Sequence, residues 1–315
     1  MISSRRRFIK IAATNSAAFA LASQTRLFSA LPSATLRKWE GIVLGAQATI
    51  QLNCESENKA ERVLKSCVSE IQRLENIFSL YDERSSLSLL NRSKRLSSAP
   101  TELVELLRYA QSFGQSTRGI FDVTIQPVIT AYREHFEANE SGLPLNLKEA
   151  LHAVDYRHIK INRRDIELSH PQATVTLNGV AQGYITDKIA ELLRGEGFGH
   201  TLIDLGEKRA LDNHPSGRDW QLGLANGFGL HEVAELNNNA LSSSGGYGTS
   251  FDSTGKHHHL IDPRTGLSVN HHASVHVIAK TATLADALST TLATCSREEA
   301  KEIEQSFPEA RVARS

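Results

Sequence analysis

The spacing of apolar residues predicts two amphipathic helices in the first half of the chain. Over residues 58–78 apolar side chains recur at helical spacing and fall on one face. A second helix is expected over residues 101–117, where Gly119 follows as a stop signal. Residues 39–52 predict one or two strands, with glycines at the bends.

The remaining pattern mixes short strands with helices at irregular intervals. Strands are predicted at 158–168 (two, around a turn), 173–177, 201–205, 220–224, near 232–233 and at 274–279. Helices are predicted at 184–194 and 284–292, and irregular segments at 119–127, 133–147 and 240–248. This irregular interleaving favours an α+β fold with mixed sheets over a doubly wound parallel sheet.

The composition is that of an ordinary globular protein. The 315 residues contain 35 Lys+Arg and 35 Asp+Glu, so the formal net charge is zero and no nucleic-acid partner is expected. The three cysteines, Cys54, Cys67 and Cys295, are too few and too scattered for a disulfide framework. Because Cys67 falls on the apolar face of the first helix, we expect a packed, unreactive thiol there.

The N-terminus has the pattern of an export signal. Ser4-Arg5-Arg6-Arg7-Phe8-Ile9-Lys10 precedes a mildly apolar run, which resembles a twin-arginine signal. The run is too short and too polar to span a bilayer. We therefore expect residues 1–30 to be a twin-arginine export signal and the protein to be periplasmic, anchored to the membrane if the signal is retained. The alternative is a basic N-terminal arm.

Two segments of the second half have the residue types of a phosphate and cation site. Residues 178–183 form a glycine turn between a predicted strand and a predicted helix, where free backbone N–H groups can bind a phosphate. Asp286 and Thr290 lie four residues apart and share one helix face, which offers hard oxygen ligands for Mg²⁺. Each segment also has a purely structural interpretation, as a simple strand–helix connection and a capping carboxylate.

A run of histidines precedes a tight turn near the C-terminal end. His257, His258 and His259 lead into Asp262-Pro263-Arg264-Thr265-Gly266, whose residue types are typical of a turn. This turn would display His259, Asp262 and Arg264 at an edge that a ligand can reach. The alternatives are a hairpin tip with solvated histidines, or a zinc or copper site that would also use the histidines at 271, 272 and 276.

Seven sequence blocks, taken in order, resemble the ApbE family of FAD:protein FMN transferases. The blocks are Leu44-Gly45, Phe78-Ser79-Leu80-Tyr81 with residues 86–91, Gly119-Ile120-Phe121-Asp122-Val123-Thr124, residues 178–184, residues 243–247, residues 259–266 and residues 285–290. The resemblance implies two α/β subdomains with mixed, mainly antiparallel sheets and a ligand cleft between them. It assigns residues 31–300 to the transferase domain and leaves 301–315 as a charged tail.

Members of this family cleave FAD and attach FMN through a phosphoester to a threonine of a target flavoprotein, with release of AMP. The resemblance therefore implies Mg²⁺ as cofactor, FAD as substrate and a flavoprotein with an acceptor threonine as partner. It implies Mg²⁺ ligands at Asp286 and Thr290, with the carbonyl of Ala181 or Gly179 as a further partner. The positions that resemble FAD contacts are Leu44, Tyr81, Ile120, Phe121, Asp122, Gln182 and Ile261, with the rings of Tyr81 and Phe121 as aromatic surfaces.

His259 is the candidate base that takes the threonine proton, whereas His257 and His258 are expected to be surface residues. Three positions depart from the family pattern. Ser289 stands where some members have a second acidic ligand, and Gln182 replaces a frequent Lys or Glu. Residues 205–210, Leu-Gly-Glu-Lys-Arg-Ala, resemble the NosX-type branch, which serves a membrane flavoprotein of nitrous-oxide respiration. Two other functions are kept as alternatives: an FAD-cleaving hydrolase or scavenging relative, and a non-enzymatic periplasmic metal carrier.

Overall fold

The computed structural model describes residues 35–54, 56–226 and 229–314, and the predicted export signal at residues 1–30 lies outside this part of the chain. One seven-stranded sheet, in the order β1-β2-β6-β7-β10-β13-β14, forms the centre, and its neighbouring strands are antiparallel. Its strands are β1 Thr35–Val43, β2 Ala46–Cys54, β6 Thr201–Asp204, β7 Lys208–Leu211, β10 Ala240–Ser244, β13 Val275–Ala279 and β14 Arg311–Arg314. The α+β prediction is confirmed.

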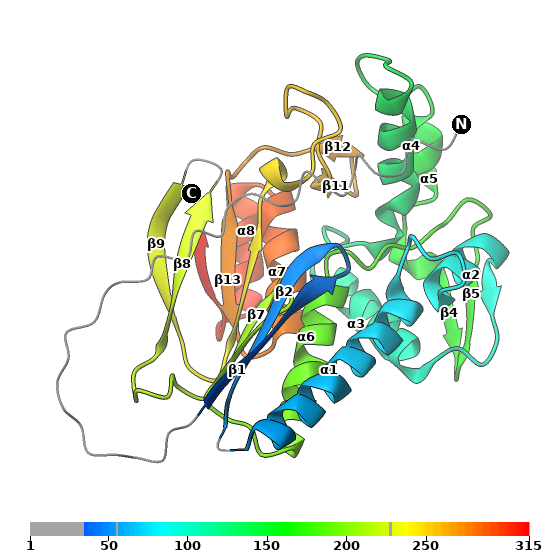
Figure 1. Ribbon diagram of the computed structural model, residues 1–315. Coiled ribbons are helices and arrows are strands. Elements are labelled where there is room, and N and C mark those ends of the chain that lie inside the picture. Colours follow the sequence, from blue (N-terminus) through cyan, green and yellow to red (C-terminus); the bar gives the residue numbers. More distant parts are fainter. Residues whose placement is uncertain (1–34, 55, 227–228, 315) are drawn as a thin grey trace.

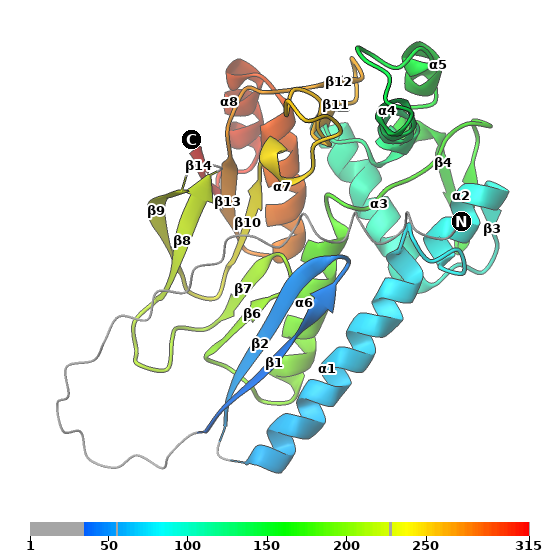
Figure 2. The same cartoon turned by 45° about the horizontal axis from the view of Figure 1, so that its top comes forward.

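Three helices cover one face of this sheet, as Figures 1 and 2 show. They are α1 Glu57–Phe78, α6 Ala181–Gly195 and α7 Ala282–Thr294, and α8 Arg297–Ser306 lies beside α7. The apolar stripe of α1 that the sequence predicts is the face that is buried, including Val63, Cys67, Ile71 and Leu74. Burial raises the pKa of the Cys67 thiol to about 12, so this thiol is protonated and unreactive at neutral pH.

A hairpin of β8 Trp220–Asn226 and β9 Gly229–Leu236 supplies apolar side chains to the opposite face of the sheet. Leu224, Ala234 and Leu236 pack there with Ala210 and Leu241 of the central strands. The sheet around β7 and β10 is therefore covered on both faces, and most residues of these two strands are buried.

A second, smaller group of elements adjoins the end of α1. It consists of α2 Ser86–Ser93, β3 Arg95–Leu96, α3 Thr101–Ser116, the short helix η3 Tyr156–His158, β4 Ile159–Asn162 and β5 Asp165–Leu168. The three strands form a separate sheet in the order β3-β5-β4. Its apolar residues join the same core as the central sheet.

Helices α4 Gln126–Glu137 and α5 Leu147–His152, preceded by the short helix η2 Val123–Ile125, form the third group. The sequence prediction of an exposed connection at 133–147 is wrong for its first part, because α4 continues to Glu137 and buries Tyr132 and His135. The hairpin of β11 Ile261–Asp262 and β12 Leu267–Ser268 lies between α4 and the end of α7, next to the short helix η4 Gly246–Gly248 (Figures 1 and 2).

Three further predictions need correction. Residues 173–177 form no strand with the described part of the chain. Instead the Val175 N–H donates to the Asn91 side-chain oxygen at 2.7 Å, and the Asn91 side-chain nitrogen donates to the Val175 carbonyl at 2.8 Å. Residues 240–244, predicted as a loop, form the strand β10 near the middle of the sheet. The predicted tail at 301–315 is, as far as Arg314, the end of α8 and the edge strand β14 paired with β13.

Candidate functional site

The candidate cation ligands meet where the first turn of α6 packs against α7. The Gly183 backbone N–H donates to Oδ2 of Asp286 at 3.1 Å, so the carboxylate is held at the N-terminal turn of α6. Thr290 lies one turn further along α7 and packs against Gly179, where an added Cβ would lie 3.1 Å from the Thr290 hydroxyl oxygen. Ala181 is the first residue of α6, between these two contacts. The structure therefore brings Ala181, Asp286 and Thr290 together.

The close contact of the two helices requires a glycine at position 183. A Cβ at this position would lie 2.3 Å from the carbonyl oxygen of Ala282, and neither backbone can move without separating α6 from α7. Gly183→Ala should therefore destabilise the protein by about 1–3 kcal/mol, the usual cost of overpacking. Gly195→Ala at the end of α6 is the matched control, because its Cβ would meet no atom within 4 Å. Thermal unfolding should show a lower Tm for the first variant only, and equal Tm values would contradict the packing argument.

Asp286 is a buried carboxylate with little to neutralise it. It is 4% exposed, and its described hydrogen bond comes from Gly183. Burial, and next the nearby Glu207 carboxylate, raise the pKa of Asp286 well above its usual range. The Tyr109 hydroxyl and Oε2 of Glu207 are buried and have no partner among the described residues, and both groups interact electrostatically with Asp286. Orphaned oxygens beside a buried carboxylate fit a hard divalent cation such as Mg²⁺.

Leu44 and Gln182 lie on the sheet side of the same turn. Leu44 occupies the tip of the β1–β2 hairpin with a φ of 45°, and its N–H donates to the Glu75 carboxylate at 2.8 Å. The Gln182 amide donates to the Val43 carbonyl at 3.5 Å and lies against Gly206. The two predicted FAD positions are thus held together by the hairpin tip and the start of α6.

Ile120, Phe121 and Asp122 precede α4, and their side chains face inward. The Phe121 ring is 4% exposed and packs edge-on against Phe113, so the expectation that this ring offers a surface for FAD is wrong. Asp122 accepts hydrogen bonds from the Thr124 N–H and hydroxyl and from the Tyr156 N–H, and burial raises its pKa. Its carboxylate is occupied in fixing the turn.

The other two predicted FAD positions differ greatly in exposure. Tyr81 is 79% exposed, so its ring is available to a ligand. Ile261 is 4% exposed and packs in a cluster with Val128, Ala131 and Tyr132 of α4. Tyr81 thus keeps the predicted aromatic surface, whereas the Ile261 side chain joins the β11–β12 hairpin to α4.

His259 is half-buried and has a defined tautomer. Its Nδ1 lies 3.0 Å from the carbonyl oxygen of Thr249, which can only accept, so Nδ1 carries the hydrogen and Nε2 has the free lone pair. Burial lowers the pKa of His259, so the imidazole is neutral at neutral pH. A neutral imidazole with a free Nε2 is the form that a general base requires.

The expectation that His257 and His258 are surface residues is wrong. His258 is 1% exposed; its Nδ1 accepts from the Leu260 N–H at 3.2 Å, and its Nε2 bonds to the Asn270 amide oxygen at 3.0 Å. The His257 ring packs against the rings of Tyr132 and Phe136, with centroids 5.8 and 5.2 Å away. Both therefore support the fold around His259.

Asp262 and Arg264 are also less accessible than predicted. The turn itself is confirmed, since the Gly266 N–H donates to the Asp262 carbonyl at 2.8 Å and Gly266 has a φ of 71°. However, Asp262 is 7% exposed and pairs with Arg264 at 2.9 Å, and Arg264 also reaches Glu299 of α8. These charges tie the hairpin to α8.

A row of serines, which sequence reasoning missed, connects the α7 ligands to the loop before His259. The Ser289 hydroxyl lies 2.9 Å from that of Ser242 and 2.8 Å from that of Ser244, both on β10. Residues 245–249 then lead to His259, and a Cβ at Gly246 would collide with the His258 ring at 2.8 Å. Only the run of small residues at 240–248 hinted at this close packing.

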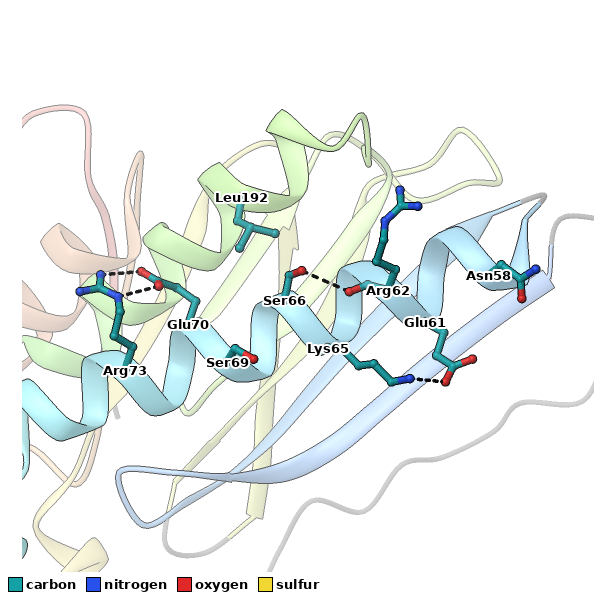
Figure 3. A pocket seen from close by; sticks show the side chains of 9 residues that line it. All are labelled: Asn58, Glu61, Arg62, Lys65, Ser66, Ser69, Glu70, Arg73 and Leu192. Atoms are coloured by element: carbon teal, nitrogen blue, oxygen red, sulfur yellow. Dashed lines mark hydrogen bonds and ion pairs between the residues drawn. The ribbon is translucent and has the colours of Figure 1, made fainter.

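The hollow along α1 and α6 is lined by none of the candidate site residues. Figure 3 shows a hollow along α1 and α6, lined mainly by charged side chains that pair with one another, such as Arg73 with Glu70 at 2.8 Å. Within the described ranges, no group of three or more His, Cys, Asp or Glu side chains could hold a metal ion. None of the described helices has the length and apolar character needed to cross a bilayer.

The fold is α+β, and the candidate cation ligands lie beside the turn at the start of α6. The family model described as "ApbE family" matches residues 44–313, so the chain belongs to the ApbE family. The match extends past the boundary at residue 300 that the sequence predicts.

Relatives of this chain are FAD:protein FMN transferases. It is 31% identical to the one from Haemophilus influenzae over 243 residues, which cover 71% of this chain and 70% of the relative. It is 27% identical to the one from Escherichia coli over 248 residues, which cover 73% of this chain and 70% of the relative. In fold it is similar to the ApbE protein of Thermotoga maritima, with a TM-score of 0.79 and 22% sequence identity. The match covers 89% of this chain and 94% of the Thermotoga chain. It is also similar in fold to the flavin transferase ApbE of Vibrio cholerae, with a TM-score of 0.78 and 22% sequence identity. This match covers 89% of this chain and 93% of the Vibrio chain.

Proposed function

We propose that this chain is a Mg²⁺-dependent FAD:protein FMN transferase, which cleaves FAD and attaches FMN through a phosphoester to a threonine of a target flavoprotein. The observation that carries the proposal is the contact of the α6 turn with Asp286 and Thr290, at 3.1 Å for the Gly183–Asp286 hydrogen bond. A carboxylate, a hydroxyl and a helix N-terminus in one place suit a cation shared with phosphates. Membership of the ApbE family and the names of the relatives support flavin transfer.

The reaction needs a base and a bond exchange at one phosphorus. The threonine oxygen attacks the phosphorus of the FMN half, and the bond from that phosphorus to the bridging oxygen breaks. AMP leaves with the bridging oxygen. Because Nδ1 of His259 donates to Thr249, its Nε2 is free to take the threonine proton.

The residues around Asp286 position the pyrophosphate. Bound Mg²⁺ would supply charge neutralisation at the phosphate oxygens. Asp286 and Thr290, with the Ala181 carbonyl, are the groups proposed to hold it. At the start of α6 the N–H groups of Ala181 and Gly183 already donate, to Leu177 and to Asp286. Leu44, Gln182 and Tyr81 are the positions proposed to contact FAD.

The proposal predicts a covalent, fluorescent product. The purified protein, FAD and Mg²⁺ should label a target domain that carries the acceptor threonine, and a denaturing gel should show flavin fluorescence on that domain. A target domain with this threonine changed to alanine is the control. A target that stays unlabelled, although the protein binds FAD, would refute transferase activity.

Hydrolysis is the second candidate function, and Ser289 is the observation that favours it. This position is a serine, with its hydroxyl 2.8–2.9 Å from two others, where some family members have a second acidic ligand. Water in place of threonine would give FMN and AMP. AMP release that is equally fast with and without the target domain would favour the hydrolase over the transferase.

We also propose that the enzyme acts in the periplasm on a membrane flavoprotein of nitrous-oxide respiration. The twin-arginine pattern at residues 4–10 and the NosX-like residues 205–210 support this assignment. A reporter fused to residues 1–34 should be exported, and it should stay in the cytoplasm of cells that lack the twin-arginine translocase. Export of the reporter in cells with and without this translocase would contradict the assignment to the twin-arginine pathway.

A further inference from the structure

Glu207 is a buried carboxylate without a role in the reaction proposed above. It lies directly before β7 and is 7% exposed. The Ser242 side chain lies near enough to lower its pKa, whereas its Oε2 has no hydrogen-bond partner among the described residues. A buried carboxylate oxygen without a donor is costly, and a bound cation would offset that cost.

The strand register directs Glu207 toward the α7 ligands. β7 and β10 are antiparallel with Lys208 opposite Leu241, so the preceding Glu207 comes opposite Ser242. The Ser242 hydroxyl in turn lies 2.9 Å from that of Ser289, which is three residues after Asp286 on α7 and donates to the Asp286 carbonyl at 3.1 Å. The two carboxylates are close enough for the charge of Glu207 to act on Asp286.

The positive side chains near this pair have other partners. Arg209 faces Asp187 with 3.6 Å between Nε and Oδ1, and Lys208 pairs with Asp204 at 3.6 Å. Asp187 itself caps the start of α7, where it accepts from the N–H groups of Ala282 and Thr283. Lys208 is the described positive side chain whose charge reaches Glu207, and none is recorded for Asp286. A bound divalent cation would supply the positive charge that favours the ionised form of both carboxyls.

We propose that Glu207 supplies the second carboxylate of the cation site, in the place where Ser289 brings no charge. The inference rests on the proposed function, in which Asp286 and Thr290 hold Mg²⁺. The second negative charge then comes from Glu207, directly before β7 of the sheet, instead of from a residue of α7. Ser289 takes the role of a hydrogen-bonding link between β10 and α7.

The test is cation binding without FAD or acceptor. The wild-type protein should bind Mn²⁺, measured by electron paramagnetic resonance. It should also bind Mg²⁺, measured by calorimetry. Glu207→Gln, which keeps the shape and removes the charge, should weaken binding at least tenfold. Its metal-free Tm should equal or exceed that of the wild type, because a buried repulsion is lost. The control is Glu191→Gln, which removes an exposed charge of α6 and should change neither value.

A rescue variant distinguishes ligation from a structural role. Glu207→Gln combined with Ser289→Asp moves the carboxylate to α7 and should recover most of the lost affinity. Unchanged affinity in Glu207→Gln would overturn the proposal, and so would a variant that is destabilised without metal and is not rescued by Ser289→Asp. A wild-type protein that transfers FMN but binds no cation would refute this inference and leave the transfer reaction standing. A wild-type protein that binds the cation through Glu207 but transfers no FMN would refute only the proposed transferase function.

Discussion

Asp286→Asn is expected to reduce FMN transfer by at least about a hundredfold, as the loss of a group that stabilises transferring phosphate charge usually does. The side chain is buried, and its carboxylate is the negative group that α7 presents at the α6 turn. Asparagine keeps an oxygen that accepts from Gly183 but removes the charge. Single-turnover assays at saturating FAD and Mg²⁺ measure the loss.

The fold of this variant should be intact. Because burial and the repulsion by Glu207 disfavour the charged form of Asp286, removing the charge should leave the metal-free Tm unchanged or raise it. Added Mg²⁺ should then raise the Tm of the wild type only. Full activity in Asp286→Asn would refute its assigned role in the site.

His259→Ala is expected to lower kcat by about 10²–10⁴-fold, the usual contribution of a general base. The KM for FAD should change little, because the base acts on the acceptor hydroxyl. The wild-type rate should fall as the pH falls, since protonation removes the lone pair of Nε2. Burial lowers the pKa of His259, so this fall should occur below the ordinary histidine value of about 6.5.

The pH profile separates a catalytic role from a structural one. In His259→Ala the residual rate should no longer fall over this acidic range. His271→Ala is the control, since His271 is an exposed histidine of the same region and should keep the wild-type profile. A residual rate in His259→Ala with the same acidic fall would show that another group is the base.

The elements that the sequence predicts well are those whose pattern is local. The stripe of α1 and the i, i+4 placement of Asp286 and Thr290 on α7 follow from helical geometry alone, and both are confirmed. Residues 173–177 look like a strand by the same reasoning, but the Asn91 side chain replaces the partner strand. That contact joins residues 84 positions apart, so local pattern cannot predict it.

Side-chain burial at the site also depends on distant partners. His258 and His259 are adjacent in the sequence, yet the first is bonded to Asn270 and the second to Thr249. Glu207 looks like a surface residue at a strand start, and only the pairing of β7 with β10 and the packing of α7 bury it. The sequence therefore predicts that Asp286 and Thr290 share a helix, but it does not predict the residues that surround them.

The most direct test of flavin transfer is the mass of the acceptor threonine after incubation with FAD and Mg²⁺. We predict that the peptide with this threonine gains the mass of FMN less one water, and that one AMP is released for each peptide modified. Asp286→Asn and His259→Ala should both lose this modification. AMP release with an unmodified threonine, or modification that persists in Asp286→Asn, would contradict the proposed function of the site.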